Sequence, residues 1–248
     1  MGFFSRLFSS DESEPSEGQI RRAIKQITQM HGEAANRVAA MERLAFWRTP
    51  ESAAALLRRF TVQTPRASMD LEEKQYTVKL LTEMGEVAVK PIIAWLKTAP
   101  DVALPVQALK NICSSEKYHA SLVEVLETLS SGYSRWPEAT VVLIAGLDDE
   151  AFAQVGETVH RFLDDDNDDI CIAAADYLVR NGGEAVREKL LQIFLAADGR
   201  PRVRGRILDH FHEQNWGVGK NKNDVEALIS LPFYLTSKGM VKRREGAA

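Results

Sequence analysis

Apolar side chains recur at helical spacing along most of this chain. Tyr76, Leu80 and Met84 follow an i, i+4 pattern, Gly85 supplies a turn, and a second apolar stripe begins behind it. From Asp70 to Trp216 this pairing of two amphipathic helices returns about every 31 to 36 residues, a period typical of stacked helix pairs. The pattern therefore predicts an all-α fold, a right-handed α-α superhelix of antiparallel helix pairs.

Glycines and prolines give the remaining boundaries. Pro137, Gly183 and Pro201 each lie between two apolar stripes, where a helix ends or begins. A short last helix is expected from Asp224 to Leu231. The chain divides into five predicted segments: an apolar docking peptide at 1–8, an acidic flexible linker at 9–18, a degenerate N-terminal helical cap at 19–69, helix-pair repeats at 70–231 and a basic C-terminal tail at 232–248.

Some segments carry a more specific pattern, in which a loop Asp or Pro precedes Val-Arg and a Gly precedes an Ala-rich apolar run. The best instances are Pro201-Arg202-Val203-Arg204, Gly85 with Ala88, Val89 and Ile92, and Asp168-Asp169-Ile170. These segments resemble HEAT repeats, which are armadillo-like helix pairs, although Cys171 and Leu104 stand where that family often has Arg. The resemblance implies a solenoid whose second helices line a concave surface, and such solenoids mostly bind other molecules.

Charge is unevenly distributed along a chain whose formal net charge is only −4. Residues 146–169 contain nine acids against one base, and residues 200–248 contain ten bases against five acids. This asymmetry predicts a molecule that is dipolar along its repeat axis, with ordinary solvated faces as the alternative explanation. No apolar stretch reaches the roughly 18 residues of a membrane span, so a soluble cytoplasmic protein is expected. Cys113 and Cys171 lie in helical core patterns and are expected to be buried free thiols.

No catalytic, metal or cofactor site can be assembled from the sequence. The run Asp164–Asp169 begins like a calcium loop but lacks the Gly and the bidentate Glu that such a loop needs further on. Gly217-Val218-Gly219-Lys220 lacks the preceding strand and the following Ser or Thr of a phosphate loop. His119 and His160 stand on consecutive second helices without enough neighbouring ligands for metal binding or acid–base work. A capped turn, a loop and two ordinary histidines are the expected roles.

The N-terminus carries a separate signal, because Phe3, Phe4, Leu7 and Phe8 form an apolar tip beside a single Arg. The tip is too short for a signal peptide and does not fit the myristoylation pattern. The acidic linker behind it cannot bury enough apolar surface to fold. We expect a docking peptide for a partner protein, a shallow peripheral membrane contact, or a tip that folds back on the first helices.

These features together predict a non-enzymatic adaptor or scaffold that binds a protein partner. Exposed positions on second helices and the two terminal segments are the candidate binding residues: Phe3, Phe4, Leu7, Phe8, Glu124, Glu127, Gln154, Glu157, Arg161, Arg202, Arg206, Phe233, Tyr234, Lys242, Arg243 and Arg244. The alternative is a nucleic-acid-binding protein that uses the basic C-terminal region, but a sequence pI of about 5.8 favours the protein partner. An enzyme and a purely structural subunit are the remaining alternatives.

The arginines of the last repeat are expected to play different roles. Arg202 and Arg206 share a helix face and are left for solvent or a ligand. Arg204 lies beside the buried stripe, so we expect it to extend along a helix-pair interface to an acidic partner.

Overall fold

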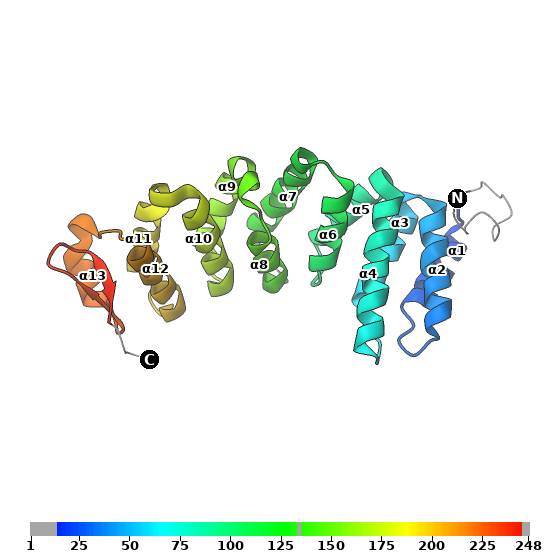
Figure 1. Ribbon diagram of the computed structural model, residues 1–248, viewed down its shortest axis with the longest axis horizontal. Coiled ribbons are helices and arrows are strands. Elements are labelled where there is room, and N and C mark those ends of the chain that lie inside the picture. The colour runs from blue at the N-terminus through cyan, green and yellow to red at the C-terminus, as the bar shows by residue number, and fades with distance from the viewer. Residues whose placement is uncertain (1–13, 133–134, 245–248) are drawn as a thin grey trace. The chain divides into compact units, whose positions relative to one another are not determined.

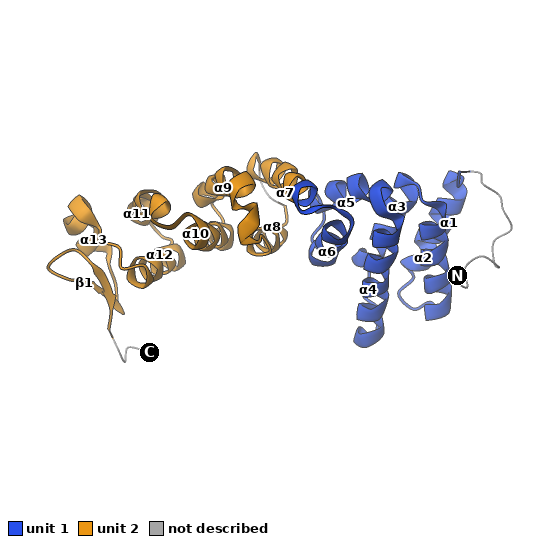
Figure 2. Ribbon diagram, turned by 45° about the horizontal axis from the view of Figure 1, so that its top comes forward, with its two compact units in different colours: residues 1–118 blue, residues 119–248 orange. Residues whose placement is uncertain are grey.

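Helices form almost all of the regular structure, as the apolar spacing predicts (Figure 1). The computed structural model describes residues 14–132 and 135–244. Contacts divide the chain into two units, residues 1–118 and residues 119–248 (Figure 2). The all-α prediction is therefore confirmed, and each unit is described separately below.

Unit 1 is built from neighbouring rows of helices. The bounds of its helices are Glu17–Ile27 (α1), Ala34–Trp47 (α2), Pro50–Leu57 (α3), Ala67–Met84 (α4), Val89–Leu96 (α5) and Ala103–Ile112 (α6). In one row α4 packs against α2 and α6, and in the other α3 packs against α5. Leu44, Leu81 and Ile92 are fully buried between these rows. The burial of such side chains contributes most of the stabilising free energy of each helix pair.

Unit 2 continues the alternation of first and second helices. The helix α7 (Ser115–Ser130) contains the division between the units. The elements behind it are Pro137–Ala145 (α8), Phe152–Arg161 (α9), Asp168–Gly182 (α10), Arg187–Ala196 (α11), Pro201–Glu213 (α12), Lys222–Leu228 (α13), Phe233–Leu235 (β1) and Val241–Arg243 (β2). The central helix α10 packs against α8, α9 and α12. Tyr177, Phe194 and Phe211 are buried in its core.

Local sequence signals set the ends of several helices. Gly85 and Gly183 follow α4 and α10 with φ angles of 68° and 55°, a backbone region that favours glycine. At the start of α10, the side-chain oxygen of Asn167 accepts hydrogen bonds from the N–H groups of Asp169 and Ile170, at 2.9 and 3.2 Å. The acidic run that resembles a calcium loop is therefore a capped helix start, as predicted.

The first helix begins earlier than the linker prediction allows. Ser16 and Gln19 form a reciprocal capping box, in which each side chain satisfies the backbone of the other. As a result α1 starts at Glu17, within the segment expected to be flexible. The acidic composition that suggested a linker also suits the first turn of a helix.

The C-terminal segment differs from the tail that the sequence suggested. The last helix is Lys222–Leu228 rather than Asp224–Leu231, and the residues behind it form an antiparallel hairpin in which Phe233 pairs with Arg243. Phe233 and Val241 are buried, because β1 packs against α13 and β2 against α12. The strands have three residues each, too few for their alternation to stand out from the surrounding charges.

Side-chain bonds link positions that lie about one repeat apart. In unit 1, Arg37 on α2 bonds Glu73 on α4, 36 positions away. In unit 2, Arg206 on α12 bonds Asp176 on α10, 30 positions away. In both cases the bond joins neighbouring first helices, so the helix-pair period extends into the predicted N-terminal cap.

Candidate protein-binding surface

A groove of about 550 Å³ lies between α8 and α10, on first helices rather than on the second helices that the sequence suggested. Val141, Val142 and Ala145 form one wall and Ile172 and Ala173 the other. Val142 is 43% exposed, which is unusual for a branched apolar side chain within a packed row. The groove is thus an open apolar surface, and we refer to it as the α8/α10 groove.

Basic side chains of α12 form ion pairs with the acidic residues that α10 contributes to this groove. Nη2 of Arg202 lies 2.5 Å from an Asp169 oxygen, and Nε of Arg206 donates to Asp176 at 2.7 Å. The buried His210 places its Nε2 2.7 Å from the same Asp176 oxygen. Burial by itself raises the pKa of Asp176, but the hydrogen bonds from His210 and Arg206 outweigh it and the pKa is lowered. Asp176 therefore stays ionised and partnered at neutral pH.

Tyr177 and Arg180 close the next part of the groove. The Tyr177 hydroxyl donates to the carbonyl of Asp148 at 3.2 Å, and burial raises the pKa of this phenol to about 12. The Arg180 guanidinium lies 5.4 Å from the centre of the Tyr177 ring and donates to Asp149 at 3.0 Å. Both side chains are anchored by α10's own neighbours, so this wall of the groove is preformed.

Glu138 differs from the other charged residues around the groove. It is exposed in the first turn of α8 and has no ion-pair or hydrogen-bond partner among residues 14–132 and 135–244. Asp169 and Asp176 are neutralised by bases of this chain, whereas Glu138 leaves one negative charge at the edge of an apolar surface. This combination favours a ligand with apolar groups and one positive charge.

The predicted second-helix residues are exposed but lie outside the α8/α10 groove. They belong to two helices: Glu124 and Glu127 to α7, and Gln154, Glu157 and Arg161 to α9. Of the histidines on these helices, His119 is buried with Nε2 3.0 Å from Asp148, and His160 is exposed. The two histidines therefore have different environments and form no common site.

The arginines of α12 fit their predicted roles in part. Arg202 is exposed and Arg206 is half-buried, so both reach solvent as expected, but each also pairs with an acid of α10 that lies one repeat earlier. Arg204 lies at the interface with α11 as expected, yet its Nε donates to the carbonyl of Phe194 at 3.1 Å rather than to an acid. The acidic and basic blocks of the sequence partly neutralise each other, which weakens the predicted charge asymmetry.

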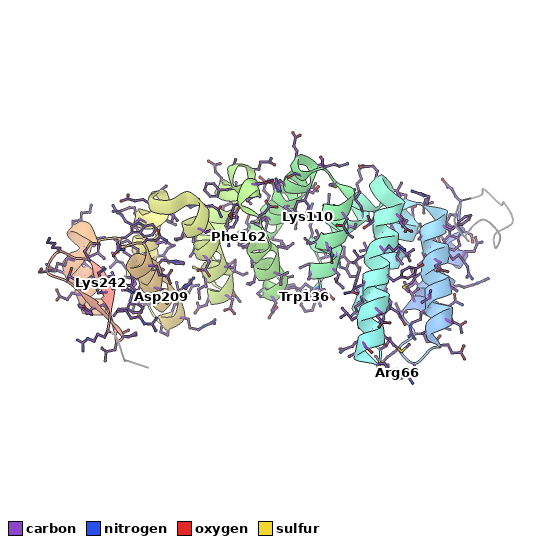
Figure 3. All side chains as sticks on the ribbon, viewed as in Figure 1. Arg66, Lys110, Trp136, Phe162, Asp209 and Lys242 are labelled. Atoms are coloured by element: carbon purple, nitrogen blue, oxygen red, sulfur yellow. The ribbon has the colours of Figure 1, made fainter. Side chains whose placement is uncertain are left out.

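The C-terminal candidates are largely occupied within the hairpin and its neighbours. Phe233 is only 8% exposed, so it packs inside the unit instead of serving as an anchor, while Tyr234 is 40% exposed. Lys242 donates to Asn215 at 2.7 Å, and Figure 3 shows its side chain on the hairpin. The guanidinium of Arg243 lies over the Phe233 ring, and that of Arg244 lies over the Tyr234 ring. Tyr234 with Arg244 is the most accessible part of this set.

The N-terminal docking residues lie outside the described residues. Phe3, Phe4, Leu7 and Phe8 precede residue 14, where the description of the chain begins. Their role as a docking peptide remains a prediction from the sequence.

A buried cluster of charges in unit 1 was not foreseen. Arg59 is fully buried, donating to Asp70 at 2.7 Å and to Glu73 at 3.0 Å. Arg37 binds both carboxylate oxygens of Glu73, at 2.9 and 2.7 Å, and Lys74 lies 3.0 Å from Asp70. Burial by itself raises the pKa of Asp70, but hydrogen bonds from Arg59, the Thr64 N–H and Lys74 lower it to about 2. The 36-residue spacing of Arg37 and Glu73 was the only sequence signal for this cluster.

The cysteines carry no sign of reactivity. Cys113 and Cys171 are free, and Cys171 is buried with its sulfur 3.2 Å from the Leu163 carbonyl. Burial raises the pKa of both thiols, which disfavours the reactive thiolate. In the described parts of the chain, no group of three or more His, Cys, Asp or Glu residues is arranged to hold a metal ion. Within those same parts, no helix is long and apolar enough to span a membrane.

Comparisons of this chain with known proteins identify no relative. No known protein family matches the sequence, and neither a curated protein nor a solved structure shows significant similarity to it. The functional argument therefore rests on the geometry of this chain.

Proposed function

We propose that this chain is a non-enzymatic adaptor of the HEAT-like solenoid class, and that the α8/α10 groove holds a short segment of a partner protein. The observation that carries the proposal is the groove itself, an open cavity of about 550 Å³ that is lined mostly by apolar side chains of two otherwise well-packed helices. Cavities of this size that are mostly apolar and have a few polar groups at the edge are typical of ligand-binding sites.

The solenoid part of the proposal rests on the repeated contacts. First helices pack against first helices in each unit, and their side-chain bonds recur at one-repeat spacing. Nearest-neighbour stacking of this kind generates a right-handed superhelix when the pairs turn regularly. The exposed residues of α7 and α9 remain predicted contacts for a larger partner.

The chemistry of the groove defines the expected occupant. Two or more apolar side chains of the partner would contact Val142 and Ile172, burying surface at about 25 cal/mol per Å². A Lys or Arg next to them would meet Glu138, the carboxylate without a partner of its own among the described residues. Such an ion pair contributes orientation and association rate more than affinity.

Selection of short random peptides on the immobilised full-length chain tests this proposal. We expect enriched peptides to combine apolar residues with Lys or Arg, and to bind in solution by fluorescence anisotropy. Val142→Asp should weaken their binding about tenfold or more, because it introduces a desolvated charge into the apolar wall. The matched control is Leu71→Asp, since Leu71 is 51% exposed on a first helix of unit 1 and lies outside the groove.

Two outcomes would contradict the proposal. Failure to enrich any peptide, or equal loss of binding in Val142→Asp and Leu71→Asp, would remove the α8/α10 groove as a docking site. Salt-sensitive binding of a short DNA duplex in place of peptides would support the nucleic-acid alternative. That alternative is weakened by the pairing of Arg200, Arg202 and Arg206 with acids of this chain, which leaves fewer charges for phosphates.

A further inference from the structure

A second pocket, of about 320 Å³, lies in unit 1 where the N-termini of α2 and α4 meet. Its lining includes Glu33 and Ala34 at the start of α2, and Thr64, Pro65 and Arg66 before α4. Figure 3 shows Arg66 at the end of α4, beside the loop that leads into α2. Two helices of 14 and 18 residues thus direct their N-termini toward one pocket.

Neither of these helix ends is capped by a side chain. The residues at the cap positions, Glu33 and Arg66, make no capping hydrogen bond, whereas α1 and α3 are capped by Ser16 and Thr49. In α4 the first hydrogen bond back to the cap is donated by Asp70, so the N–H groups before it have no helical acceptor. Unsatisfied N–H groups and the positive ends of two helix dipoles both favour an anion.

The walls of the pocket supply a second, independent indication of a ligand. Thr64 is 6% exposed, and its hydroxyl has no hydrogen-bond partner among the described residues. Buried polar groups are nearly always paired, so this hydroxyl lacks an acceptor that a ligand would provide. The guanidinium of Arg66 is also available, since its hydrogen bond within the described residues is a 3.7 Å contact with Met69 sulfur.

One side of the pocket is held by Arg37, and the formal charges around the pocket sum to a positive value. Arg37, which is 4% exposed, bonds the carbonyls of Gln29 and Gly32 and so fixes the loop that forms one side. The buried cluster below contains the bases Arg37, Arg59 and Lys74 and the acids Asp70 and Glu73, an excess of one positive charge. The charges of Arg66 and Glu33 cancel each other, so the excess remains. Met30 and Met69 add apolar surface at the edge.

We infer that this pocket binds a phosphate group, free or as a small monoester. Its oxygens would accept hydrogen bonds from the first-turn N–H groups of α2 and α4, from the Thr64 hydroxyl and from Arg66. An organic substituent would contact Met30 and Met69. The pocket lies in unit 1, whereas the α8/α10 groove lies in unit 2, so the two sites stand independently.

Amide NMR of the full chain tests the inference, with inorganic phosphate and phenyl phosphate each titrated at constant ionic strength against chloride. We expect saturable shifts of the amides at Ala34, Ala67 and Ser68. Arg66→Gln should weaken binding about tenfold, and Thr64→Val about threefold, because each removes one hydrogen bond to the anion. Arg22→Gln is the control, since Arg22 is an exposed arginine of α1 outside the pocket.

The two probes separate the possible sources of the phosphate. If phenyl phosphate binds more tightly than inorganic phosphate, the ligand is a monoester whose organic group contacts the methionines. If the two affinities are equal, the ligand is inorganic phosphate. Absence of saturable shifts with both probes would overturn the inference. So would shifts that persist unchanged in Arg66→Gln and Thr64→Val, because the anion would then bind elsewhere.

Discussion

Both units join neighbouring first helices by acid–base pairs, but they bury these pairs to different extents. In unit 1, Arg37 and its partner Glu73 are only 4% and 5% exposed. In unit 2, the side chains of Arg202 and Asp169 are 63% and 57% exposed. Ion pairs in water contribute little, whereas removing one member of a buried pair leaves an uncompensated charge. Loss of one member of such a pair is thus expected to lower the stability of unit 1 strongly and that of unit 2 only slightly.

The strongest way to break this comparison is Arg59→Met. We expect it to lower the free energy of unfolding by about 3–5 kcal/mol, because Asp70 and Glu73 lose a buried partner that satisfies both. Urea denaturation followed by circular dichroism measures the change. Arg58→Met is the matched control, since Arg58 is exposed and lies 6.0 Å from the Trp95 ring. A loss of the same size in both variants would show that the cluster is not special.

Acid titration tests the same cluster without removing its bases. The pKa of Asp70 is about 2 in the folded chain, below the value of about 3.9 for an unfolded Asp. A depressed pKa stabilises the fold above the unfolded value, and this contribution of about 2–3 kcal/mol is lost as the pH falls from about 4 to 2. Asp70→Asn should remove that part of the pH dependence of the unfolding free energy. An unchanged slope would mean that Asp70 is not ionised in the cluster.

The smallest effect is expected in unit 2, from Arg202→Ala. Its ion pair with Asp169 is exposed to solvent, so the urea midpoint should stay within experimental error of the parent chain. Repeating the measurement at high salt should leave both proteins equal, because exposed pairs are screened. A clear loss of stability would show that the α10–α12 contact depends on this pair. The ion pairs of the two units would then differ less in their contribution to stability than their exposure suggests.

The helices could be predicted because their cause is local. Stripes such as Tyr76, Leu80 and Met84 define a buried face, and Gly85 and Gly183 mark turns with positive φ angles. The superhelical arrangement of the pairs, the role of the N-terminal tip and the binding of a protein partner stay predictions.

The buried cluster and the α8/α10 groove could not be predicted in the same way. Arg37 and Arg59 are bases among mostly apolar neighbours in the sequence, and their acidic partners become apparent only when α2 and the turn behind α3 pack against α4. The groove depends on small side chains such as Ala145 and Ala173 meeting across two helices. Both features arise from contacts between residues of different repeats, which a periodic pattern does not distinguish from ordinary surface.

The one-repeat spacing of the side-chain bonds has a consequence for how the chain folds during synthesis. Arg206 bonds Asp176, which lies only 30 residues earlier in the sequence. Arg37 bonds Glu73, which lies 36 residues later. Contacts of such limited range close short loops and are formed quickly. We therefore expect each of these two pairs to form soon after its later helix has left the ribosome.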